Sequence, residues 1–150
     1  MNFSSSDHTR VYNHLVISDA LHTSGQPTPA QFQAIKEAGF THVINLAPSH
    51  TANSLKKQPQ ILEKLGLRYT YIPVDFKAPN DEDFAAFTTA MSEKPDEKIW
   101  VHCQANMRVS AFIYRYRCET LGEDEATARE DILKIWEPFG VWKKFTRWPG

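Results

Sequence analysis

The sequence contains little cysteine, and its charges are balanced. Its 150 residues include only two cysteines, Cys103 and Cys118, and 17 basic against 18 acidic side chains. The two cysteines form neither a disulfide framework nor a metal-ligand pattern, so a reducing compartment fits best. We expect Cys118, within an apolar helical pattern, to pack in the core. A net charge of −1 provides no general attraction for nucleic acid, so recognition of an anion has to be local.

Long apolar runs are missing as well. No segment reaches the length of a membrane span, and the start, MNFSSSDHTR, lacks the apolar core of a secretory signal. We therefore expect a cytoplasmic protein with no membrane or nucleic-acid partner. The length suits one domain over residues 1–150, with residues 1–10 flexible. No set of His, Asp or Cys residues has the spacing of metal ligands, so we expect no metal and no cofactor.

What the sequence does contain is a regular alternation of strand and helix patterns. Apolar, β-branched runs predict strands at NHLVIS, LHTSG, THVINLA, RYTYIPVDF and KIWVHC. Helical patterns follow at TPAQFQAIKEAGF, NSLKKQPQILEKLG, NDEDFAAFTTAMSE, RVSAFIYRYRCETLG and in the tail over residues 124–148. We expect the tail's Trp136, Trp142 and Trp148 to pack in the interior. This order predicts one α/β domain, with a mainly parallel sheet of about four to five strands flanked by helices.

Parallel sheets bind ligands at the carboxyl ends of their strands, and Cys103 lies at such an end. The apolar run 99–101 precedes it, and an apolar helix pattern begins at Val109, so a short polar loop closed by Arg108 lies between them. Loop amides, a helix N-terminus and an arginine all favour a thiolate, the nucleophilic form of cysteine. Arg108 adds a planar fork that matches the oxygens of a phosphate or sulfate. The loop therefore predicts an anion cradle, with further contacts from Gln104, Ala105, Asn106 and Met107.

Several neighbours of this loop have predicted supporting roles. Ser110 is placed to hydrogen-bond the cysteine sulfur. His102 points to the opposite side of its strand and fits a buried scaffold role. Gln26, Asn45 and Ser49 lie on loops that the fold brings to the same rim, where they are candidate binding residues. In the plainer interpretation, Cys103 is a small buried side chain and Arg108 is a solvated residue at a helix start.

The segment VHCQA with its following serine resembles the signature loop of cysteine-dependent protein phosphatases, especially the dual-specificity type. There, His-Cys opens the loop and Arg-Ser or Arg-Thr closes it. The stretches SGQPT, GFTHVINL and YIPVD resemble parts of a small bacterial phosphatase-like family, which also occurs fused to metallo-β-lactamase-like hydrolases. Together these stretches cover residues 24–112. The resemblance implies the protein-tyrosine-phosphatase-like fold and a phosphorylated substrate, with Cys103 as nucleophile and Arg108 as phosphate clamp.

A phosphatase of this type needs a carboxylic acid to protonate the leaving oxygen. Asp75 is the first candidate, because it ends the apolar strand pattern YIPVD. Asp81 and Asp83 are the alternatives, but acids after Asn80 are also what the start of a helix favours.

The spacing between Cys103 and Arg108 keeps other functions open. Four residues separate them, one fewer than in those phosphatases. A loop of this length resembles that of rhodanese-like sulfurtransferases, which carry a persulfide on the cysteine. The phosphatase resemblance over four stretches outweighs this single spacing, so we expect a metal-independent phosphomonoesterase that forms a phosphocysteine. The alternatives are a sulfurtransferase and a phosphatase-shaped binding module without turnover.

Overall fold

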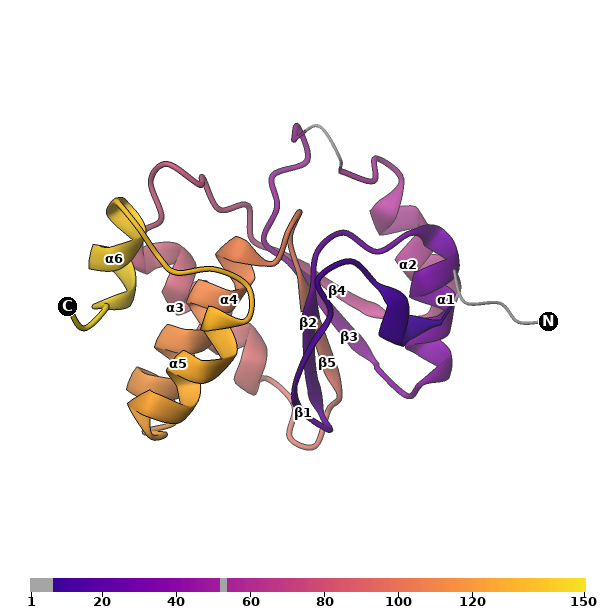
Figure 1. Cartoon of the computed structure of the whole chain (residues 1–150). Helices are drawn as coiled ribbons and strands as arrows, with labels where there is room; N and C mark the ends of the chain where they lie inside the picture. The colour runs from indigo at the N-terminus through magenta and orange to yellow at the C-terminus, as the bar shows by residue number, and fades with distance from the viewer. Residues whose placement is uncertain (1–6, 52–53) are drawn as a thin grey trace.

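The computed structural model describes residues 7–51 and 54–150, and helices pack on both faces of its central sheet (Figure 1). The strands of this sheet are β1 (Leu15–Ser18), β2 (Leu21–Ser24), β3 (His42–Asn45), β4 (Arg68–Tyr71) and β5 (Ile99–His102). The helices are α1 (Pro29–Glu37), α2 (Gln58–Leu65), α3 (Asp81–Ser92), α4 (Met107–Arg115), α5 (Glu125–Leu133) and α6 (Val141–Thr146). None of the helices in the described ranges is long and apolar enough to cross a membrane.

The sheet has the strand order β1-β2-β5-β3-β4. All neighbouring pairs run parallel except β1 and β2, which form an antiparallel pair at one edge. This confirms the predicted α/β fold with a mainly parallel sheet. Ser24, Asn45 and His102 occupy the same register level at the carboxyl ends of β2, β3 and β5. The loops that leave these three strands therefore begin side by side.

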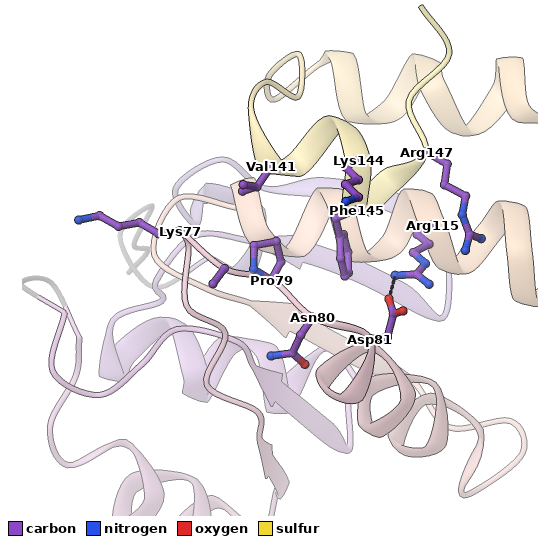
Figure 2. A pocket seen from close by; sticks show the side chains of 10 residues that line it. Lys77, Pro79, Asn80, Asp81, Arg115, Val141, Lys144, Phe145 and Arg147 are labelled. Atoms are coloured by element: carbon purple, nitrogen blue, oxygen red, sulfur yellow. Dashed lines mark hydrogen bonds and ion pairs between the residues drawn. The ribbon is translucent and has the colours of Figure 1, made fainter.

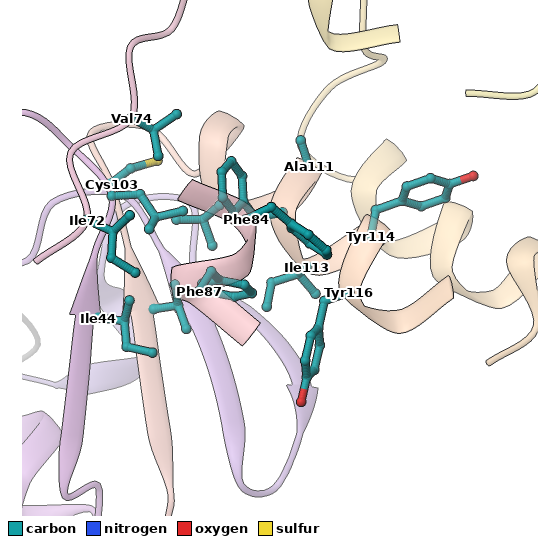
Figure 3. Close-up of a cluster of buried hydrophobic side chains, with 14 of the residues drawn as sticks. Ile44, Ile72, Val74, Phe84, Phe87, Cys103, Ala111, Ile113, Tyr114 and Tyr116 are labelled. Atoms are coloured by element: carbon teal, nitrogen blue, oxygen red, sulfur yellow. The ribbon is translucent and has the colours of Figure 1, made fainter. Parts of the chain in front are cut away.

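Successive residues of β5 point to two different cores. Ile99, Val101 and Cys103 belong to the larger cluster of buried side chains, which includes residues of α3 to α6 (Figure 3). Trp100 belongs to the smaller cluster, built with residues of α1 and α2. The ring of His102 lies 5.7 Å from that of Phe32 in this smaller cluster. Cys103 and His102 thus face opposite sides of the sheet, as the alternation of a strand predicts.

The helix starts follow the predicted capping patterns. Thr28 and Gln31 form a complete capping box at the start of α1. The Asn80 side chain accepts a hydrogen bond from the Asp83 amide at the start of α3. At the N-terminus, Asp7 caps a 3₁₀ turn over His8–Arg10, whereas the rest of the segment predicted to be flexible lies outside the described residues.

One predicted element is shorter than expected. The apolar pattern extends the fourth strand to Asp75, but β4 ends at Tyr71. Regular pairing with β3 stops there, because the next two amides that face β3 bond to consecutive carbonyls instead of alternate ones. The amides of Ile72 and Val74 still donate to the carbonyls of Asn45 and Leu46, at 2.9 and 3.0 Å. Asp75 consequently lies in a turn beyond the strand rather than at its end.

Candidate active site

Cys103 follows β5 directly, and its side chain is fully buried. The Cys103 amide donates to the Ser24 carbonyl at 3.3 Å, and the carbonyl of His102 accepts from the Leu46 amide at 2.9 Å. Bonds to the ends of both neighbouring strands therefore fix the backbone at this point. The predicted position of Cys103 at a carboxyl end of the sheet is confirmed, and its side chain is also a member of the larger core.

Asn106 makes the turn from the cysteine loop into α4. Its backbone is left-handed, with φ of 67°, and asparagine tolerates this conformation better than most residues do. Its buried side-chain amide donates to the Asn13 carbonyl at 2.9 Å and to the Thr23 hydroxyl at 3.1 Å. Asn106 is thus held inward and shapes the loop, and its side chain does not lie on the rim as a binding group.

The SGQPT stretch, residues 24–28, packs tightly against the same loop. Gly25 pairs with Ala105, and the Gln26 amide donates to the Gln104 carbonyl at 3.1 Å. A Cβ atom at Gly25 would lie 2.6 Å from the Gln104 carbonyl oxygen, closer than real contacts allow. Glycine at this position therefore permits the close approach that shapes the cysteine loop.

Several backbone N–H groups of the loop and of the start of α4 have no hydrogen-bond partner in the part of the chain that the structure describes. Among the described residues, no acceptor lies within hydrogen-bond geometry of the amides of Gln104, Ala105, Met107, Arg108 and Val109. The last three of these amides belong to the first turn of α4, where the helix itself provides no acceptor. Free amides at a helix N-terminus, together with the helix dipole, form a ready site for an anion.

Arg108 reaches from the first turn of α4 to the segment that follows β4. Its Nε donates to the Val74 carbonyl at 2.9 Å, and its guanidinium lies over the Phe76 ring at 5.3 Å. Its two terminal nitrogens form no hydrogen bond with the described residues. Arg108 is therefore positioned by one nitrogen while the other two stay available.

Asp75 and Arg108 line the same pocket, which has a volume of about 630 Å³. The Asp75 carboxylate accepts a 2.9 Å hydrogen bond from the Lys77 amide, which holds it in a tight turn. The remaining lining residues are Pro48, His50, Thr51, Tyr71, Pro73, Phe76 and Lys77. The structure thus brings together the predicted acid and the predicted clamp, although Asp75 is not at a strand end.

Asp81, the alternative acid, lines a different pocket. It forms a 2.8 Å ion pair with Arg115, and this hydrogen bond and charge lower the pKa of Asp81. Burial raises the pKa of Asp83, whose amide is bound by the Asn80 cap. Neither residue lines the pocket of Arg108.

The Ser110 hydroxyl has other hydrogen-bond partners than the predicted one, the sulfur of Cys103. It donates to the Met107 carbonyl at 3.1 Å and accepts from the Trp136 indole at 2.9 Å. Ser110 begins the second turn of α4, where a serine readily bonds back to a carbonyl three residues earlier. The expected bond to the sulfur is therefore replaced by a link between the helix and the C-terminal tail.

His102 has the predicted scaffold role. Burial lowers its pKa to about 4, so its ring is neutral at neutral pH. Its Nε2 lies 2.7 Å from Nε2 of Gln58, and its Nδ1 lies 3.1 Å from the Cys103 carbonyl. Gln58 in turn accepts from the Gln26 side chain at 3.0 Å. This buried chain of polar groups links the backbone of Cys103 to α2. No sequence pattern indicates the role of Gln58.

The other predicted binding residues lie around the rim but outside the Arg108 pocket. Asn45 is buried, with its side chain bonded to Tyr69 and to the Ala47 amide. It lines a neighbouring pocket with Ser49. Gln26 and Gln104 line a third pocket. Phe76 also lines the Arg108 pocket and lies beneath the guanidinium of Arg108. No sequence motif marks Phe76, and its position directly after Asp75 is the one sign of this role.

Comparison with known proteins identifies the family. The sequence model of the family described as "DSP-PTPase phosphatase fused to NAD+ Kinase" matches residues 4–136. The chain belongs to this phosphatase family. The recognised resemblance to cysteine-dependent, protein-tyrosine-phosphatase-like proteins is thereby confirmed, as is the assignment of the chain to a class of phosphatases.

Individual relatives support this assignment. A "Beta-lactamase hydrolase-like protein" of Agrobacterium fabrum is 28% identical over 144 residues, and the match covers 88% of this chain but only 30% of that protein. The chain thus spans less than a third of this curated relative. A DUF442 protein from Shewanella putrefaciens is 29% identical, with 93% of both chains covered and a TM-score of 0.83.

More distant structures share the fold. The catalytic domain of the PP-IP phosphatase Siw14 from S. cerevisiae, in complex with citrate, is 12% identical with a TM-score of 0.74, over 92% of this chain and 85% of that one. TpbA from P. aeruginosa, in complex with pTyr, is 16% identical with a TM-score of 0.65, over 80% of this chain and 71% of that one.

The described residues contain no group of three or more His, Cys, Asp or Glu side chains arranged to hold a metal.

Proposed function

We propose that this phosphatase-family protein is a metal-independent phosphomonoesterase that works through a phosphocysteine at Cys103. The observation that carries the proposal is the convergence of four features at one edge of the sheet. These are Cys103 at the end of β5, the free amides that follow it, and Arg108 and Asp75 in one pocket. Membership of the phosphatase family supports the same reaction class.

The proposed chemistry has two steps. The Cys103 sulfur attacks phosphorus, the bond from phosphorus to the leaving oxygen breaks, and Asp75 gives a proton to that oxygen. Water then attacks the phosphocysteine, Asp75 takes up a proton from it, and inorganic phosphate and the free thiolate are released. The loop amides and the fork of Arg108 stabilise the charge on the three equatorial oxygens. These donors perform the task that a metal ion performs in other phosphatases.

The buried state of Cys103 adds a requirement. A side chain without exposure cannot meet phosphorus unless the surrounding loop moves. The free loop amides and the terminal nitrogens of Arg108 can donate hydrogen bonds to a phosphate group that enters an opened loop. These hydrogen bonds do not form in the loop without phosphate. We therefore propose that the phosphate group itself favours the reactive arrangement of residues 103–108.

Hydrolysis of p-nitrophenyl phosphate in the presence of EDTA tests the proposal. We expect slow hydrolysis by the wild type, none by Cys103→Ser, and a loss of about 10²-fold or more in Arg108→Lys, because a point charge cannot replace the fork. Cys118→Ser is the matched control and should keep its activity, since Cys118 lies in the turn Tyr116–Thr120 beyond the end of α4, away from the cysteine loop.

Two outcomes would replace this proposal. Ready transfer of sulfur from thiosulfate to cyanide, with p-nitrophenyl phosphate left intact, would identify a sulfurtransferase that carries a persulfide on Cys103. Binding of inorganic phosphate without turnover of either substrate would identify a binding module.

A further inference from the structure

We infer that a second pocket beside the candidate active site binds a second phosphate group of the same small substrate molecule. This inference rests on the proposed function, because it concerns which phosphomonoesters the enzyme accepts. The pocket has a volume of about 510 Å³ and lies between the start of α3, the end of α4 and α6 (Figure 2). None of the residues proposed for catalysis lines it.

The charge of this pocket is positive. Its cationic lining residues are Lys77, Arg115, Lys144 and Arg147. Asp81 is the one carboxylate in the lining, and Glu119 lies just outside, where it pairs with Arg115 and Arg147. Four cations against these two acids leave two positive charges. A pocket of this sign attracts anions and repels cations.

The cations differ in how firmly they are held. Arg115 is bound by Asp81 at 2.8 Å and lies over the rings of Phe84 and Phe145, at 4.2 and 4.8 Å. It is therefore a fixed part of the pocket wall. Lys77 and Lys144, in contrast, form no ion pair with any residue that the structure describes. A lysine ammonium is a compact charge on a flexible stem, and it commonly binds phosphate.

Lys77 connects the two pockets. It lines both of them, and its backbone amide donates to the Asp75 carboxylate at 2.9 Å. In Figure 2, the Lys77 side chain extends away from the other labelled residues, whereas Lys144 lies beside Phe145 and Arg147 lies beside Arg115. A molecule with one phosphate at Arg108 can therefore extend past Lys77 and place another near Lys144.

The size and lining of the pocket favour a small molecule as the occupant. Both pockets fall within the range of about 300–1,000 Å³ that is typical of small-molecule sites. Pro79, Val141 and Phe145 give the second pocket an apolar wall, against which the body of such a molecule can pack. The chemistry thus matches a small bisphosphate, whose two charged ends are separated by a less polar body.

Steady-state kinetics with fructose 1,6-bisphosphate and fructose 6-phosphate test this inference. We expect a lower KM for the bisphosphate. In Lys144→Gln its KM should rise about two- to fivefold, the range for one exposed charge pair, with kcat nearly unchanged. The KM of the monophosphate should stay the same, and Lys144→Arg should restore the KM of the bisphosphate. Lys143→Gln is the matched control. It removes the same charge from the same helix, and Lys143 does not line the pocket.

Equal KM changes for both substrates, or equal effects of Lys143→Gln and Lys144→Gln, would overturn the inference. So would a preference for singly phosphorylated peptides with acidic residues over the bisphosphate. A titration of Cys103→Ser with inorganic phosphate, monitored by the NMR chemical shifts of the backbone amides, separates this inference from the proposed function. Shifts around Lys144 and Arg147 that Lys144→Gln abolishes would support the pocket even if no substrate is hydrolysed, and their absence would count against it.

Discussion

Asp75 and Asp81 show how the setting of a carboxylate decides its chemistry. Asp81 is fixed as an anion by Arg115, which lowers its pKa, and it faces the second pocket. Among the described residues, the Asp75 carboxylate has only a backbone amide as partner, and it shares its pocket with Arg108. An ion pair that must break before proton transfer makes a poor general acid, so the structure favours Asp75.

Substitution of these two acids distinguishes them. A general acid contributes about 10²–10⁴-fold, and only where the leaving oxygen needs a proton. We therefore expect Asp75→Asn to slow phenyl phosphate hydrolysis far more than p-nitrophenyl phosphate hydrolysis, and Asp81→Asn to affect both alike and weakly. The measurement is kcat for each substrate. The reverse pattern would assign the acid to Asp81.

At the level of single residues, the sequence predicts those whose chemistry is distinctive. Cys103 and Arg108 are recognisable because a thiol and a guanidinium flank a loop between an apolar strand and a helix. Phe76 and Gln58 are not recognisable, because a phenyl ring and an amide occur everywhere in proteins. Their roles arise only from the partners that the fold gives them, Arg108 for the ring and His102 for the amide.

At the level of elements, local capping made the helices predictable, and tertiary contacts decided the rest. The Thr28 capping box and the Asn80 cap are short-range signals, and both helices start where these signals predict. The end of β4 depends on how the segment around Pro73 meets β3, which no local pattern reveals. The sequence predicts only packing for the C-terminal tail, whereas Trp136 and Trp142 also donate hydrogen bonds to Ser110 and to the Phe76 carbonyl.

The indole of Trp142 holds the acid-bearing turn. It donates to the Phe76 carbonyl at 2.8 Å, and its ring lies 5.4 Å from that of Phe76. Trp142→Phe keeps an aromatic ring but leaves this carbonyl without its donor. We expect a loss of about 1 kcal/mol in unfolding free energy. We also expect a fall in kcat that is larger for phenyl phosphate than for p-nitrophenyl phosphate, because the position of Asp75 matters most there.

The control for this prediction is Trp148→Phe. Trp148 packs on Tyr114 and donates no side-chain hydrogen bond to the described residues. Urea unfolding and kinetics with both substrates should show little change for it. A Trp142→Phe enzyme that loses stability but keeps the same ratio of the two rates would restrict Trp142 to a packing role.

At the scale of the whole molecule, buried histidines couple the fold to pH. Burial lowers the pKa of His22 to about 4, and burial likewise lowers that of His102 to about 4. The same cause lowers the pKa of His14 and of His42. Each ring therefore takes up a proton less readily in the folded protein than in the unfolded chain, where its pKa is near 6.5. The unfolded state therefore binds more protons between these values, and acid favours it.

The fold should consequently lose stability as the pH falls from about 6.5 to about 4, with full stability above that window. A single fully buried histidine with this shift accounts for roughly 3 kcal/mol at the acidic end. His102→Gln removes one such group, so we expect it to be less stable than the wild type at pH 7 but to lose less stability between pH 7 and pH 5. His50→Gln, at an exposed position, should follow the wild type. Urea unfolding across this range measures the slopes, and equal slopes for wild type and His102→Gln would show that His102 does not carry the dependence.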